Sequence, residues 1–134
     1  MIYVIIGLYS LRVLHGLLNW FFKEKPESNY ESFDLKNVDI LIPVRNEEDR
    51  IRPSLERLIP LSKEVGKIII LNDNSSDDTK AILELYKGHF KIHHGKEKTE
   101  YWNGKNWACE QLAQHSKNEY ILFIDIDVTI DANA

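Results

Sequence analysis

The chain has 134 residues, of which 43% are hydrophobic and 28% charged, so it is an ordinary globular chain of at most one small domain. Its net charge is −4 and no run of Lys and Arg occurs, which excludes a basic nucleic-acid-binding surface. The single cysteine, Cys109, excludes an internal disulfide and a cysteine-based zinc site, and it fits a reducing compartment.

Residues 1–22 are mostly apolar and about long enough to cross a bilayer as a helix. Arg12 and His15 lie one turn apart on one face, and a central arginine costs about 2.5–3.5 kcal/mol on insertion scales. A basic leading segment and an Ala-x-Ala site are both missing, which disfavours a cleaved signal peptide. We expect a retained single membrane span, with an interfacial helix and a buried soluble helix as alternatives. Lys23 and Lys25 would place the domain after a span in the cytoplasm.

Residues 23–37 are polar and are expected to link the apolar segment to a domain over residues 38–134. Four apolar runs of that domain are the expected strands: 38–43, 67–71, 90–93 and 120–124. Helical spacing occurs between them, first at Ile51, Leu55 and Leu58. This alternation predicts an α/β fold, a mostly parallel open sheet with flanking helices and with ligands at the carboxyl ends of its strands.

The last expected strand runs directly into two carboxylates, Asp125 and Asp127. Because side chains of a strand alternate with a period of two, both carboxylates are expected to point the same way. Aspartate is rarely buried without a partner, so the pair suggests a divalent cation or a ligand hydroxyl. An acidic turn that merely ends the strand is the structural alternative.

Polar residues also follow the first two expected strands. Arg45 and Glu47 come just after the first, and Asp73 comes just after the second. In an open parallel sheet these residues and the two later aspartates gather along one edge, where a ligand binds. Glu47 can instead complement a helix dipole, and Asp73 can form an Asx turn. Neither GxGxxG nor GxxxxGK[ST] occurs, which weakens dinucleotide and P-loop interpretations.

Four motifs occur in order at sensible spacing: Ile42-Pro-Val-Arg-Asn-Glu47, Leu71-Asn-Asp-Asn-Ser-Ser-Asp-Asp-Thr79, Gly104-Lys-Asn-Trp-Ala108 and Asp125-Ile-Asp127. Together they resemble the N-terminal, donor-binding half of a family 2 glycosyltransferase with the Rossmann-like GT-A fold. The segment from Trp102 to Cys109, with Asp125-Ile-Asp-Val128 after it, is especially similar to membrane glycosyltransferases that act on carotenoid acids or hopanoid lipids.

The resemblance implies a role for each matching residue on the nucleotide side. Pro43, Arg45 and Glu47 are expected to line the nucleotide pocket after the first strand. Asp73 is expected to accept a hydrogen bond from the base, which is typically uracil in this family. The implied donor is therefore a nucleoside diphosphate-sugar, most simply a UDP-sugar.

The resemblance also implies a diphosphate side. Gly104 and Lys105 are expected to lie beside the donor, where the lysine cation offsets diphosphate charge. Asp125 is expected near the ribose or the metal, and Asp127 is expected to ligate Mg²⁺ or Mn²⁺ bridging the two phosphates. A carboxylate-held hard cation stabilises the charge that grows on a departing nucleoside diphosphate.

Family 2 enzymes place their general base and acceptor-binding half after the Asp-x-Asp motif. No catalytic residue is therefore expected within this chain, with the general base beyond Ala134, and the chain alone is expected not to transfer sugar to a lipid or other acceptor. The alternative is a noncatalytic truncated remnant, a nucleotide-binding or interaction module. An acidic-pocket receiver-like domain that binds Mg²⁺ is disfavoured by the apolar N-terminus and by the lack of a convincing phosphoacceptor arrangement.

Overall fold

The computed structural model describes residues 2–22, 34–98 and 100–130. The chain divides into two compact units, Met1–Phe33 and Asp34–Ala134, and each is described by itself. Most of the expected linker, residues 23–33, lies outside the described residues. Leu35–Asn37 form a short 3-10 helix, η1, near the start of the second unit.

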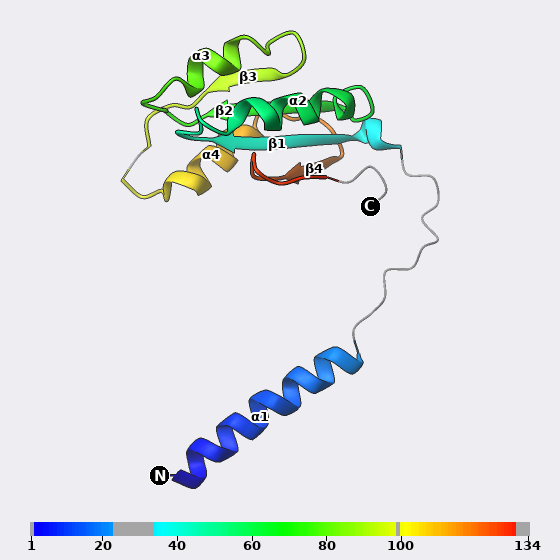
Figure 1. Ribbon diagram of the computed structural model, residues 1–134, viewed down its shortest axis with the longest axis vertical. Helices are drawn as coiled ribbons and strands as arrows, with labels where there is room; N and C mark the ends of the chain where they lie inside the picture. The colour runs from blue at the N-terminus through cyan, green and yellow to red at the C-terminus, as the bar shows by residue number, and fades with distance from the viewer. Residues whose placement is uncertain (1, 23–33, 99, 131–134) are drawn as a thin grey trace. The chain divides into compact units, whose positions relative to one another are not determined.

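A parallel four-stranded sheet with the order β3-β2-β1-β4 forms the centre of the second unit (Figure 1). Its strands are β1 (Val38–Val44), β2 (Lys67–Asn72), β3 (Lys91–His94) and β4 (Tyr120–Phe123). The helices that connect them are α2 (Ile51–Leu61), α3 (Thr79–Glu84) and α4 (Gly104–Ala113). The expected α/β fold with a parallel sheet and flanking helices is confirmed.

Successive residues of the central strands enter two different apolar layers, because side chains alternate between the faces of a sheet. Ile40 and Ile70 pack in one layer with Leu55 of α2. Leu41 packs in the other layer with Leu112 of α4. Figure 1 shows α2 and α3 on one side of the sheet and α4 on the other. Burial on both faces explains why these strands are almost wholly apolar.

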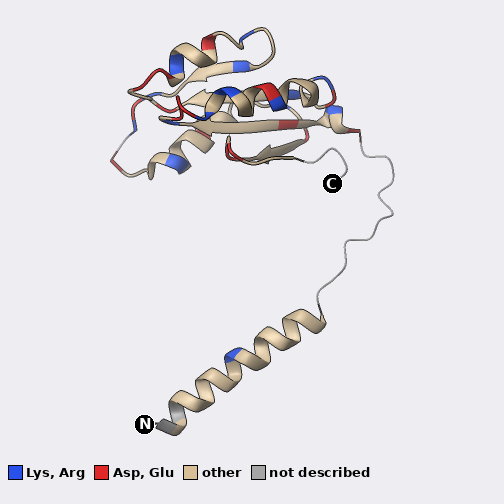
Figure 2. Cartoon of the chain, viewed as in Figure 1, with Lys and Arg blue, Asp and Glu red and all other residues tan. Residues whose placement is uncertain are grey.

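Helix α1 (Ile2–Phe21) is the described element of the first unit, and its described apolar side chains are between 47% and 85% exposed. Among the residues described, no helix combines the length and the apolarity needed to cross a membrane. The expectation of a transmembrane helix over residues 1–22 is therefore not supported. Arg12 and His15 interrupt the apolar run near its middle, and Figure 2 shows one basic segment on an otherwise uncharged α1.

A buried carboxylate holds the amino-terminal ends of β1 and β4 together. Asp39 is fully buried, and its two oxygens accept hydrogen bonds from Ser116 Oγ and Asn118 Nδ2, each at 2.7 Å. Gly66 lies against this group, with its N–H donating to Val38 O at 2.9 Å. A Cβ at position 66 would lie 2.7 Å from Asp39 Oδ1 and would collide with Asn118 Nδ2.

We expect Gly66→Ala to lower the free energy of unfolding by about 1–3 kcal/mol, because the added methyl has no space without moving the Asp39 network. Gly88→Ala is the matched control, since nothing lies within 4 Å of a Cβ built there. Urea unfolding of both variants followed by circular dichroism measures the difference. Equal midpoints for the two variants would contradict the packing described at Gly66.

Two histidine rings stack between the edge strand and the end of α4. The ring centroids of His93 and His115 are 3.7 Å apart, with 15° between the ring planes. Burial, and then the charges of His115 and His94, lower the pKa of His93 below its ordinary value of 6.5. His94 points to the other side of β3, where its Nε2 lies 3.0 Å from Glu84 Oε1. The neutral form of His93 is therefore the one that fits the fold.

We expect the free energy of unfolding to fall as the pH drops from about 6.5 through the lowered pKa of His93. The unfolded chain binds a proton at His93 in this range and the folded chain does not, so acid favours unfolding. His93→Gln should flatten this part of the stability profile, whereas His89→Gln, at an exposed position, should leave it unchanged. Chemical unfolding at a series of pH values between 5 and 8 measures the slopes.

Candidate functional site

The carboxyl ends of three strands and the N-terminus of α4 surround one cavity. β1 pairs with both β2 and β4, and the pairing continues past the strand ends through Asp73 N to Val44 O at 2.8 Å and Ile124 N to Leu41 O at 3.2 Å. The cavity has a volume of about 330 Å³ and is lined by Pro43, Val44, Arg45, Glu47, Asp73, Gly104, Lys105, Ala108, Asp125, Ile126 and Asp127.

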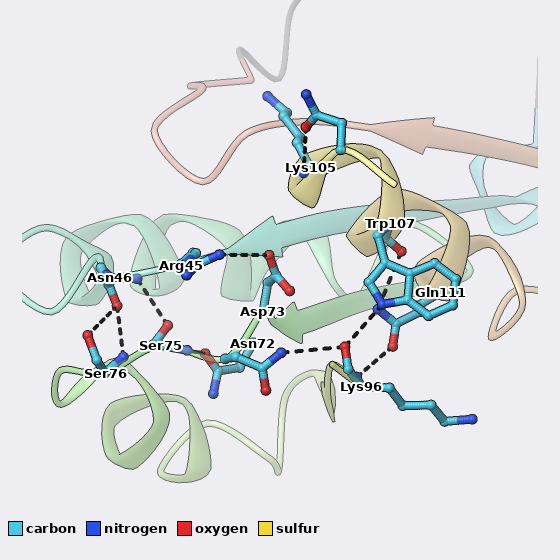
Figure 3. A network of polar contacts seen from close by, with 12 residues as sticks. Arg45, Asn46, Asn72, Asp73, Ser75, Ser76, Lys96, Lys105, Trp107 and Gln111 are labelled. Atoms are coloured by element: carbon cyan, nitrogen blue, oxygen red, sulfur yellow. Dashed lines mark hydrogen bonds and ion pairs between the residues drawn. The ribbon is translucent and has the colours of Figure 1, made fainter. Parts of the chain in front are cut away.

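Arg45 and Asp73 form a charged pair on one side of this cavity. Asp73 is 8% exposed, whereas the Arg45 side chain is largely in solvent. Arg45 Nη1 lies 3.8 Å from Asp73 Oδ2 (Figure 3), which is a charge contact longer than a hydrogen bond. The Asp73 carboxylate therefore has a nearby cation and is also placed to accept an N–H donor in the cavity.

Glu47 brings a second carboxylate to the same side. Its Oε2 atom is buried and accepts no well-oriented hydrogen bond within the described part of the chain, although Arg50 Nη2 lies 2.9 Å away. Arg50 is therefore close enough for an ion pair with Glu47, but its N–H group does not point at the Oε2 atom. The backbone N–H of Glu47 donates a hydrogen bond to Thr79 Oγ1 at 2.8 Å, which fixes the position of Glu47. A buried carboxylate oxygen with spare acceptor capacity is a feature of ligand sites.

The opposite side of the cavity is formed by the first turn of α4 and the segment after β4. Asn103 caps α4 by accepting a hydrogen bond from Lys105 N at 3.2 Å. Lys105 Nζ lies 2.7 and 2.9 Å from the two Asp125 oxygens, and this hydrogen bond raises the pKa of Lys105. Both side chains are more than half exposed, so the pair adds little stability but keeps a cation at the cavity.

Asp125 and Asp127 both line the cavity, and the chain turns between them through a hydrogen bond from Val128 N to Asp125 O at 3.1 Å. No group of three or more His, Cys, Asp or Glu side chains close enough to hold a metal occurs among the described residues. Two carboxylates are still sufficient for Mg²⁺, which usually keeps waters and binds substrate phosphates as well. The donor set therefore fits a cation that is shared with a phosphate ligand.

Cys109 lines a neighbouring cavity of about 310 Å³, which Lys105 and Asp125 also line. Phe123 and Val128 supply apolar walls to that cavity. Burial raises the pKa of the Cys109 thiol, which favours its protonated form.

All eight residues selected from the sequence line the same cavity, and the structure adds three apolar ones. Val44, Ala108 and Ile126 are nearly fully buried and form its walls. Val44 and Ile126 are sequence neighbours of the residues predicted from the sequence, and Ala108 lies one helical turn after Gly104. A sequence reading based on polar groups does not find them, because their signal is only that of ordinary core residues.

Residues 39–134 match the model of the family described as Glycosyl transferase family 2. The chain belongs to glycosyl transferase family 2. The resemblance seen in the four sequence motifs is thereby confirmed.

Curated relatives of this family 2 chain include the 4,4'-diaponeurosporenoate glycosyltransferase of Staphylococcus aureus (strain bovine RF122 / ET3-1). The two are 36% identical over 98 residues, which cover 73% of this chain and 26% of the relative. The chain therefore spans about a quarter of the length of the curated relatives it matches.

Solved glycosyltransferase structures share the fold. Glucosyl-3-phosphoglycerate synthase from Mycobacterium tuberculosis, in complex with Mn²⁺, uridine-diphosphate and glucosyl-3-phosphoglycerate, matches with a TM-score of 0.59 and 21% identity over 79% of this chain and 40% of that one. S. aureus TarS 1-349 in complex with UDP-GlcNAc matches with a TM-score of 0.50 and 24% identity over 67% of this chain and 26% of that one. These likenesses support a GT-A-type fold.

Proposed function

We propose that this chain is the donor-binding part of a glycosyltransferase that takes a nucleoside diphosphate-sugar, in particular a UDP-sugar, together with Mg²⁺ or Mn²⁺. The observation that carries the proposal is the cavity at the carboxyl edge of the sheet. It combines acceptors for a base on one side with a cation, a helix N-terminus and two carboxylates on the other. In α/β sheets this edge is the usual place for a ligand.

The base and ribose belong on the side formed by the loops after β1 and β2. Asp73 is nearly buried and can accept an N–H from the Watson–Crick edge of uracil. Pro43 and Val44 supply apolar wall beside it, and Glu47 offers a carboxylate oxygen to a hydroxyl or N–H group. A neighbouring Arg45 keeps the local charge balanced.

The diphosphate belongs on the side of α4, where the dipole at the helix N-terminus favours an anion. Lys105 adds a full positive charge in the first turn. We assign Asp125 and Asp127 to the metal, with Asp125 also near the ribose. When bound, such a cation stabilises the negative charge that develops on the departing diphosphate.

Sugar transfer is proposed for the whole protein, because this chain spans 26% of the length of its curated relatives. A lipid-type acceptor is supported by the relative's name, which refers to diaponeurosporenoate. Two named structural neighbours contain UDP or UDP-GlcNAc, and one also contains Mn²⁺, which supports the donor and metal proposed here.

We expect Asp127→Ala to weaken Mn²⁺-dependent binding of uridine diphosphate by ~10–100-fold, the range typical of damage to a metal site. Asp73→Ala should weaken binding both with and without Mn²⁺, because it removes a base contact and leaves the metal carboxylates in place. Calorimetric titration of the 134-residue chain with uridine diphosphate, in the presence and absence of Mn²⁺, separates the two effects.

Glu56→Gln is the control for this titration, since Glu56 is an exposed carboxylate of α2 outside the cavity. It should bind uridine diphosphate as the unaltered chain does. If the unaltered chain is folded but does not bind uridine diphosphate in the presence of Mn²⁺, the proposed donor site is wrong.

We also propose that α1 associates with a lipid surface as an interfacial helix. Arg12, His15 and Asn19 occur at positions i, i+3 and i+7 and form a polar stripe. Leu14 and Leu17 lie away from that stripe and are about half exposed. A helix of this kind lies in the interface with its apolar side in the acyl region.

We expect the chain to sediment with neutral phosphatidylcholine vesicles and the double variant Leu14→Gln/Leu17→Gln to remain largely in the supernatant. The reason is the lost burial of two leucine side chains, each worth about 1.5–3 kcal/mol when fully buried. The matched control His15→Gln/Asn19→Ser alters the polar stripe and should sediment as the unaltered chain does. Equal sedimentation of all three proteins, or of none, would rule out this association.

A further inference from the structure

The loop after β1 and the loop after β2 are fastened to each other by hydrogen bonds in both directions. Three successive backbone N–H groups donate to side chains across the gap: Asn46 to Ser75 Oγ at 3.0 Å, Glu47 to Thr79 Oγ1 at 2.8 Å and Glu48 to Asp77 Oδ2 at 3.2 Å. Two backbone N–H groups donate back: Ser76 to Asn46 Oδ1 at 2.9 Å and Asp78 to Glu48 Oε2 at 2.7 Å. These five hydrogen bonds hold the two segments together.

Asn46 has a special place in this contact. Its backbone has a φ of 53°, in the left-handed region that most side chains avoid. Its N–H and its side-chain oxygen both bond to the opposite loop, at Ser75 and Ser76 (Figure 3). Arg45 and Glu47, on either side of it, line the cavity, whereas Asn46 itself does not. It can therefore influence a ligand only through its neighbours.

We propose that Asn46 is a positioning residue that holds the base-binding side of the cavity in shape. Its left-handed backbone turns the chain between Arg45 and Glu47, and its side-chain oxygen fixes this turn to the loop that carries Asp73. The inference rests on the proposed function, because it concerns recognition of the same nucleotide. It adds a residue outside the cavity to those that determine affinity.

Asparagine meets two requirements that few other residues meet together. It tolerates a left-handed backbone better than most residues, because its short side chain can bond locally. It also carries an acceptor oxygen at the length needed to reach Ser76 N. Glycine meets only the backbone requirement, and aspartate meets both. Replacing Asn46 with glycine or with aspartate therefore separates the left-handed backbone of the turn from its hydrogen bond to Ser76.

Asn74 provides a matched control within the same pair of loops. It too is left-handed, with a φ of 52°, but within the described residues its side chain bonds to Lys96 O, at 3.5 Å, rather than to the segment after β1. None of the five cross-loop hydrogen bonds described above involves Asn74. Asn46→Gly and Asn74→Gly therefore relieve the same kind of backbone strain, but of the two only Asn46→Gly removes one of the five cross-loop hydrogen bonds.

The test is titration of the 134-residue chain with uridine diphosphate, with and without Mn²⁺, together with thermal unfolding of each variant. We expect Asn46→Gly to weaken binding about five-fold, the size of one lost hydrogen bond. The factor by which Mn²⁺ improves binding should stay unchanged, because the metal carboxylates are untouched. Asn46→Asp should restore binding to near its original strength, measured at about 0.15 M salt to screen the added charge.

Four outcomes would overturn the inference. They are unchanged binding in Asn46→Gly, an equal loss in Asn74→Gly, no rescue in Asn46→Asp, and a loss of binding that also removes the Mn²⁺ effect. Loss of the Mn²⁺ effect would show that the substitution disturbs the whole site and not the base-binding side alone. A lowered unfolding temperature would also reveal such a disturbance. Failure of the unaltered chain to bind uridine diphosphate contradicts the proposed function instead, so the two failures are distinguishable.

Discussion

The pairing of β1 with strands on both sides is the constraint on which the rest of the structure depends. Because β1 lies between β2 and β4 in a parallel sheet, the carboxyl ends of the three strands face the same edge. β1 and β2 end as partners at Val44 and Asn72, and β4 ends earlier, opposite Leu41. Helices pack on both faces of β1 and β2, whereas the side chains of β4 stay 40–46% exposed. The polar residues that follow all three strands line one cavity at this edge of the sheet. The cavity is a consequence of this register.

The charges around the cavity are arranged as neighbours of opposite sign. Arg45 lies beside Asp73, and Lys105 lies beside Asp125, with one pair on each side. Each pair is at least partly exposed, so neither contributes much to folding. They present both signs of charge to the cavity, which suits the polar base and anionic diphosphate of the proposed ligand.

Different parts of the fold hold the two sides of the cavity. The side of Asp125 and Lys105 depends on α4, whose N-terminus is capped by Asn103. The side of Asp73 and Glu47 depends largely on hydrogen bonds between the segments that follow β1 and β2, including one to Thr79 at the start of α3. Loops vary more among related proteins than the sheet does, so this side of the cavity is the part of the proposed site that can change most readily within a shared fold.

The sequence by itself determined the strands and the polar residues after them, because strand residues form short apolar runs and Asp73, Asp125 and Asp127 stand out where such runs end. Burial on both faces makes β1 and β2 apolar, whereas the apolar side chains of β4 stay 40–46% exposed. Only the tertiary structure decided what those residues contact. The pairing of Lys105 with Asp125, the walls formed by Val44 and Ile126, and the bond from Ser76 to Asn46 all join segments far apart in the chain. Periodicity reports which face a residue occupies, whereas its partner across a cavity depends on how loops and helices pack, and that information is not local.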